Sequence, residues 1–80
     1  MCIDYYEEAN KISKLMKNEG FNSWAQKVID SIKAGFTATE ILIELKWNFS
    51  QFLKKESTYS NELKNKVKNI IKEINLLLNN

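Results

Sequence analysis

Residues 36–53, FTATEILIELKWNFSQFL, contain the clearest helix start in the chain. Thr37 is followed three residues later by Glu40, which is the pattern of a capping box. Phe36 is placed to pack onto Ile41 as a hydrophobic staple across the start of the helix. We therefore expect a helix that begins after Thr37 and continues to about residue 53.

This segment is apolar on two faces of a helix. Ile43 and Trp47 are four residues apart and fall nearly opposite the main apolar sector. One interpretation is that a second helix covers this pair, because a central helix in a small bundle is contacted from two sides. The alternative is an exposed pair rimmed by Glu40, Glu44 and Lys46, the composition of a protein-binding hot spot. The main sector comprises Ile41, Leu42, Leu45, Phe49, Phe52 and Leu53.

Two shorter helices are expected before this segment. The first begins at Asp4, where Asp4 and Glu7 form a capping-box pattern, and it ends before Gly20. Its apolar stripe is Tyr5, Ala9, Ile12 and Met16. The second begins at Asn22 or Ser23, where Ser23 and Gln26 form another possible capping box, and closes at Gly35. Its expected inward face is Ala25, Val28, Ile29 and Ile32.

A fourth helix follows the polar linker at residues 54–58 and runs nearly to the last residue. Its apolar residues repeat at the spacing of a heptad seam. They are Leu63, Val67, Ile70, Ile74 and Leu77, and Ile71 and Leu78 widen the seam. Lys64, Lys68 and Lys72 form a separate stripe, and Leu76 lies alone on the far side. Together the segments predict one domain, residues 1–80, with an all-α fold: a compact bundle of about four helices with short loops.

The composition narrows the classes of function. The chain has 80 residues, no His, no Pro and one Cys, and all twelve of its basic residues are lysines. These absences argue against Ser-His-Asp and Cys-His catalysis, His-based metal sites and disulfide scaffolds. Helix-start positions account for several of the acidic residues without any chemistry. We therefore expect no enzyme, no cofactor and no metal.

The location of the protein is predicted from its first residues and its apolar runs. No apolar run approaches the ~20 residues of a membrane span, so we expect no membrane partner. The first residues are acidic, whereas a secretory signal has a basic start followed by an apolar stretch. We expect a cytoplasmic protein, in which Cys2 is a free thiol.

Charge leaves two alternatives to protein binding. The net charge is +2, with −2 in residues 1–45 and +4 in residues 46–80. A nucleic-acid backbone can lie along Lys64, Lys68 and Lys72, which gives a small nucleic-acid-binding regulator as the runner-up. The start of the third helix carries Thr39 and Glu44 where a recognition helix places base-reading side chains, which argues against nucleic acid. A third alternative is a structural subunit that forms a homodimer through the C-terminal heptad seam.

Residues 20–53 resemble a group of small all-helical bacterial proteins. The resemblance is carried by Ser23-Trp24-Ala25, Ile32, Gly35, Thr37, Thr39-Glu40-Ile41-Leu42 and Leu45-Lys46-Trp47. The group is the immunity proteins of toxin systems of the contact-dependent growth inhibition type. The resemblance implies a protein that binds one cognate toxin domain, frequently a nuclease, and blocks its active site or substrate access.

The partner-binding residues are expected in the acidic N-terminal half and at the Trp47 edge. A basic nuclease cleft is complementary to carboxylates. Since the whole chain is positive, we expect the contact to use its acidic half. The expected surface combines Asp4, Tyr6, Glu7 and Glu8 of the first helix with Glu40, Ile43, Glu44 and Trp47 of the third.

Overall fold

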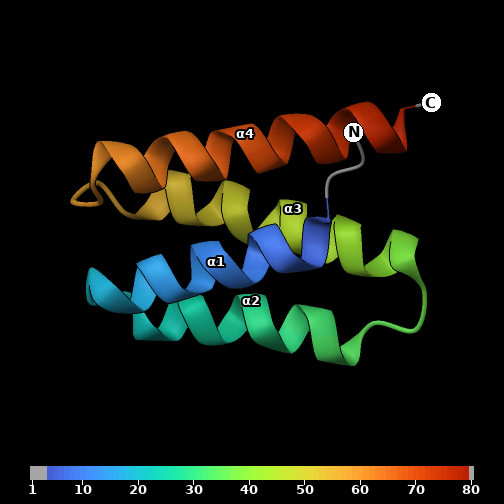
Figure 1. Cartoon of the computed structure of the whole chain (residues 1–80), viewed down its shortest axis with the longest axis horizontal. Coiled ribbons are helices and arrows are strands. Elements are labelled where there is room, and N and C mark those ends of the chain that lie inside the picture. The colour runs from blue at the N-terminus through green and yellow to red at the C-terminus, as the bar shows by residue number, and fades with distance from the viewer. Residues whose placement is uncertain (1–3, 80) are drawn as a thin grey trace.

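The structure is a computed structural model that describes residues 4–79, so Cys2 lies outside the described residues. It contains α1 (Tyr5–Asn18), α2 (Asn22–Ala34), α3 (Ala38–Lys55) and α4 (Asn61–Leu78) (Figure 1). Short connections join them, and no strand occurs within residues 4–79. The predicted all-α fold of four helices is confirmed. In the described range, no helix combines the length and the apolar character needed to cross a membrane.

Successive helices run in opposite directions and form a closed ring of contacts. α1 packs against α2 and α4, and α3 packs against the same two helices from the other side (Figure 1). α1 and α3 are therefore diagonal partners. Because each helix contacts two neighbours, one apolar stripe per helix is enough to build a shared core.

The core follows the predicted stripes closely. α3 contributes its main sector, of which Leu45, Phe49 and Phe52 are completely buried. α4 contributes four of its five seam residues. The other core positions come from one stripe on α1 and a narrower one on α2. The buried apolar side chains are Ala9, Ile12, Met16, Ala25, Val28, Ile41, Leu42, Leu45, Phe49, Phe52, Leu63, Val67, Ile70 and Ile74.

Three of the helix starts are closed by side-chain caps. Asp4 Oδ1 accepts from the backbone N–H groups of Tyr6 and Glu7, each at 3.1 Å. Thr37 and Ser60 do the same for α3 and α4 through their hydroxyl oxygens. After α1, Gly20 has φ +91°, the left-handed conformation that glycine adopts at low cost. The N-caps of the predicted capping boxes at Asp4 and Thr37 are confirmed. The reciprocal contacts differ, since Glu7 pairs with Lys11 and Glu40 accepts from the Phe36 N–H.

The start of α2 differs from the prediction. α2 begins at Asn22 with Phe21 at the N-cap, and no side chain caps it. Ser23 lies inside the first turn, and Gln26 donates to Asp30 Oδ1 at 2.9 Å instead of reaching back. The predicted Ser23–Gln26 capping box is therefore wrong. The ring of Phe21 is held by Phe52, at 5.1 Å between centroids, so tertiary packing fixes this helix start.

The predicted staple between Phe36 and Ile41 is also wrong, since Phe36 is 94% exposed. Gly35 takes an extended conformation, with φ −75° and ψ 141°. A Cβ atom at Gly35 would collide with the Ile41 side chain at Cγ1. Ile41 therefore packs directly on the Gly35 backbone, and Phe36 is left pointing outward.

The seam of α4 differs from the prediction at Leu77. Leu77 is 45% exposed, and Leu78 packs against the core in its place. A straight α-helix drifts by about 20° per heptad from a strict seven-residue repeat. Over the two heptads from Leu63 to Leu77 this drift reaches about 40°, which carries Leu77 away from the seam and leaves Leu78 beside it. Leu76 is exposed, as its position on the wheel predicts.

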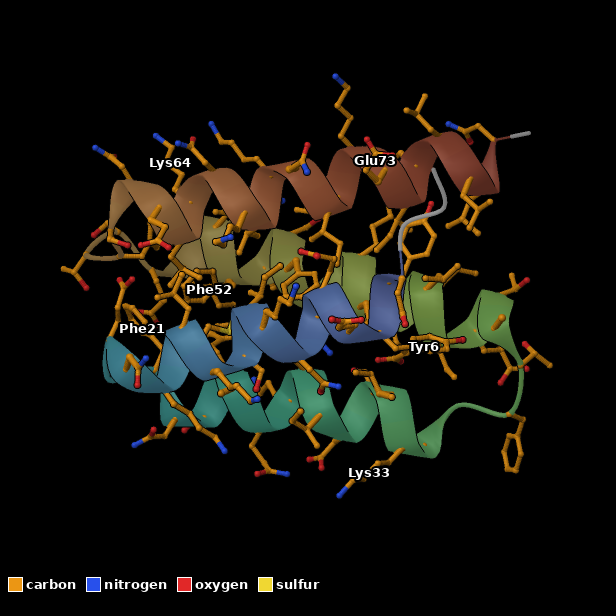
Figure 2. All side chains as sticks on the ribbon, viewed as in Figure 1. Tyr6, Phe21, Lys33, Phe52, Lys64 and Glu73 are labelled. Carbon is orange, nitrogen blue, oxygen red and sulfur yellow. The ribbon has the colours of Figure 1, made fainter. Side chains whose placement is uncertain are left out.

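An aromatic cluster joins the two helical hairpins at one end of the bundle. Phe52 contacts Phe21, Trp24 and Tyr59, with ring centroids 5.1 to 5.7 Å apart. Figure 2 shows Phe21 and Phe52 at this end and Tyr6 toward the opposite end. Glu19, which caps α1, accepts from the Ser60 backbone N–H at 2.7 Å. This contact ties the end of α1 to the connection between α3 and α4.

Replacement of a buried seam residue tests the place of α4 in the core. Ile70 is 2% exposed, so Ile70→Ala is expected to lower the free energy of unfolding by about 2–5 kcal/mol. Leu76→Ala on the same helix removes a side chain that is 54% exposed, and a change within about 0.5 kcal/mol is expected. Urea denaturation measures both. Equal small changes would show that α4 contributes little to the core.

Candidate functional site

The second apolar face of α3 is exposed. Ile43 is 51% exposed and Trp47 is 59% exposed. The core sector of α3 already meets both neighbouring helices, so no helix remains to cover this pair. Of the two alternatives left open by the sequence, the structure selects the exposed one.

Beside this pair, a hollow of about 660 Å³ lies between α2 and α3. Residues from both helices and from the loop between them line it, and we call it the α2–α3 groove. α2 and the loop supply Lys27, Asp30, Ser31, Ala34, Gly35 and Phe36. α3 supplies Glu40, Ile43, Glu44, Trp47 and Asn48.

The groove exists because its two walls differ in side-chain size. Ser31, Ala34 and Gly35 form a low wall on the α2 side. Ile43 and Trp47 form a high wall on α3. The helical positions on each wall are spaced by three or four residues, so each wall is one continuous helical stripe. Small side chains facing large ones along two antiparallel helices leave an open channel.

A buried polar contact forms the floor of the groove. Asn48 is 6% exposed and Ser31 is 7% exposed. Asn48 Nδ2 donates to Ser31 Oγ at 2.6 Å, and Ser31 Oγ donates to the Lys27 carbonyl at 2.9 Å. These two directional hydrogen bonds fix the register of α2 against α3. A shift would leave a buried donor or acceptor without a partner, which is costly.

The rim of the groove is acidic. Asp30, Glu40 and Glu44 are exposed carboxylates on its two sides. The lining also contains one cation, Lys27, whose Nζ lies 4.4 Å from the centroid of the Trp24 ring. Within residues 4–79, the ion pairs are those of Lys11 on α1, so the three rim carboxylates have no ion-pair partner.

The structure brings together four of the eight predicted site residues. Glu40, Ile43, Glu44 and Trp47 all line the groove. Glu40 also closes the turn before α3, since one of its oxygens accepts from the Phe36 backbone N–H at 3.5 Å.

The four predicted residues of α1 do not line the groove. Asp4 is the N-cap of α1, and its carboxylate is committed to backbone groups. Glu7 and Glu8 each lie 3.6 Å from the ammonium of Lys11. Tyr6 is 37% exposed and lies near the start of α1 (Figure 2). The predicted acidic surface is therefore divided between α1 and the α2–α3 groove.

Sequence reasoning missed the α2 side of the groove. Asp30, Ser31 and Ala34 interrupt or flank the apolar stripe of α2, and Asn48 interrupts the main sector of α3. A polar residue inside an apolar stripe is a signal of a buried polar contact. Its partner becomes visible only once α2 and α3 are placed side by side.

The fourth helix gives little support to the nucleic-acid alternative or to the homodimer alternative. Its seam residues Leu63, Val67, Ile70 and Ile74 are at most 2% exposed, so the seam is used inside this bundle and is not free for a second copy. Lys68 and Lys72 are exposed, and Lys64 is half-buried. No aromatic side chain interrupts this stripe for base stacking.

Neither a metal site within residues 4–79 nor a relative adds to this description. Within residues 4–79, no group of three or more carboxylate or thiol side chains is placed to hold a metal ion. Comparisons with protein-family models, curated proteins and solved structures find no match to the chain. The resemblance to immunity proteins therefore stays a prediction that rests on residues 20–53.

Loss of the polar floor is expected to weaken the packing of α2 against α3. Ser31→Ala removes the acceptor of Asn48 Nδ2 and leaves a buried donor short of its partner, which costs about 1–3 kcal/mol of unfolding free energy. Ser31→Ala combined with Asn48→Leu removes both polar groups, and part of the loss is expected to return. Thermal denaturation of the four proteins in this cycle measures the coupling. Additive changes would show that the contact has no energetic weight.

Proposed function

We propose that this protein acts by binding another protein through the α2–α3 groove. One observation carries the proposal: Ile43 and Trp47 are more than half exposed beside a hollow with an acidic rim. Tryptophan is among the residues enriched in binding hot spots, which lie in well-packed pockets. A small domain needs most of its apolar side chains for its own core, so leaving these two in water is a cost that a partner recovers.

The proposed partner is a cognate toxin domain, and the proposed role is immunity. The resemblance of residues 20–53 to immunity proteins supports this choice. The rim carboxylates Asp30, Glu40 and Glu44 suit a basic surface such as the substrate cleft of a nuclease. In that arrangement the chain neutralises the toxin by covering its active site or its path for substrate. No chemical step by this chain is involved.

The direct test is co-expression with the product of the neighbouring upstream reading frame, scoring survival of the host cells. Trp47→Ser is expected to lower the affinity for the toxin domain by at least about 30-fold, the equivalent of a 2 kcal/mol hot spot. Leu76→Ser is the matched control, since it also replaces an exposed apolar side chain but on α4. Survival that is unchanged by Trp47→Ser would exclude the groove as the binding surface.

Charge reversal identifies which charged surface takes part. Glu44→Lys is expected to weaken protection, because a like charge facing a basic partner costs several kcal/mol. The pair Lys64→Glu and Lys68→Glu is expected to leave protection intact. The pair Glu7→Lys and Glu8→Lys shows whether α1 adds to the contact. Loss of protection from the lysine pair alone would favour the nucleic-acid alternative and contradict the proposal.

A further inference from the structure

The polar atoms that line the α2–α3 groove are mostly hydrogen-bond acceptors. Asp30, Glu40 and Glu44 supply carboxylate oxygens, which accept hydrogen bonds. The hydroxyl of Ser31 already donates its hydrogen to the Lys27 carbonyl. Apart from Lys27, whose ammonium lies over the Trp24 ring, the charged groups that line the groove are acceptors. The groove therefore favours a donor-rich, positively charged group of a ligand.

Asn48 adds an acceptor at the floor. Both hydrogen bonds of Asn48 within residues 4–79 use Nδ2, toward Ser31 Oγ at 2.6 Å and the Lys27 carbonyl at 3.5 Å. Its side chain is more than nine-tenths buried, yet no fully buried polar side-chain atom in the described chain lacks a partner. Oδ1 is therefore not fully buried, and because Asn48 lines the hollow, a donor that enters the hollow can satisfy it.

Trp47 places a flat aromatic surface beside these acceptors. Glu44 and Trp47 are three residues apart on α3, and such positions are neighbours on one helix face. A guanidinium group stacks on an indole and at the same time donates two parallel bonds to a carboxylate. An ammonium group has neither the plane nor the fork. Ile43, one residue before Glu44, adds apolar surface for the aliphatic part of such a side chain.

We infer that the α2–α3 groove receives an arginine side chain of the partner protein, stacked on Trp47 and hydrogen-bonded to Glu44, with Asn48 Oδ1 accepting a further donor. The inference rests on the proposed function, because it specifies the partner group that the same groove binds. The chain contains no arginine of its own, so it cannot fill the groove with a guanidinium from its own sequence.

The probe for this inference is a displayed library of random twelve-residue peptides, selected on the full chain and counter-selected on Trp47→Ser. We expect the enriched peptides to share an arginine next to an apolar residue. Binding of one selected peptide is then followed by the NMR signals of the two indole N–H groups, of which that of Trp47 is expected to shift.

Matched peptides separate stacking, charge and fork geometry. Replacement of the arginine by citrulline keeps the shape and removes the charge, and replacement by lysine keeps the charge and removes the fork. Each is expected to weaken binding by about tenfold or more. Glu44→Gln in the protein is expected to produce a similar loss and to bring the arginine and citrulline peptides close in affinity. Leu76→Ser is expected to leave every affinity unchanged.

Three results would overturn the inference: no peptide depends on Trp47, the enriched peptides lack arginine, or the lysine peptide binds as tightly as the arginine peptide. The survival assay tests the proposed function separately from the peptide experiments. If Trp47→Ser abolishes protection while the selected peptides lack arginine, the groove binds a protein but not through a guanidinium. If the peptides behave as expected and Trp47→Ser leaves protection intact, the arginine site stands and the toxin proposal fails.

Discussion

The packing of α3 against two neighbours is the constraint on which the rest of the structure depends. α3 is the most apolar of the helices, and one broad sector of it meets α2 on one side and α4 on the other. Phe49 and Phe52 in this sector are completely buried. Once both neighbours are in place, nothing in the bundle remains to cover Ile43 and Trp47. The same packing that stabilises the core therefore fixes which apolar residues stay exposed.

Local chemistry made most of the fold predictable. Helix starts at Asp4 and Thr37 use side-chain oxygens that lie within a few residues of their donors, so sequence spacing alone identifies them. The features that failed depend on distant contacts. Phe36 stays exposed because Ile41 packs on the Gly35 backbone, and α2 starts without a side-chain cap because Phe21 packs against Phe52. The spacing of residues along one helix does not predict these contacts.

For a related reason, the sequence predicts the α3 side of the candidate site but not its α2 side. Glu40, Ile43, Glu44 and Trp47 lie on one helix face, and their spacing on a helical wheel is enough to group them. The opposite wall needs the antiparallel alignment of α2 and its small side chains, which come together only in the folded chain. The acidic residues of α1 carry the same negative charge as the rim of the groove, but they do not line it. The charges summed along a sequence give only the sign of the net charge. Which charged residues become neighbours depends on how the helices pack.

The most direct test of the central claim is a cross-saturation NMR experiment on the chain in complex with the product of the neighbouring upstream reading frame, the proposed toxin domain. The signal loss marks the groups of the chain that contact its partner. The account predicts loss centred on the Trp47 indole and extending over both walls of the α2–α3 groove, with Lys68 and Lys72 on α4 unaffected. Loss confined to the lysine face of α4, with the Trp47 signal unchanged, would contradict it.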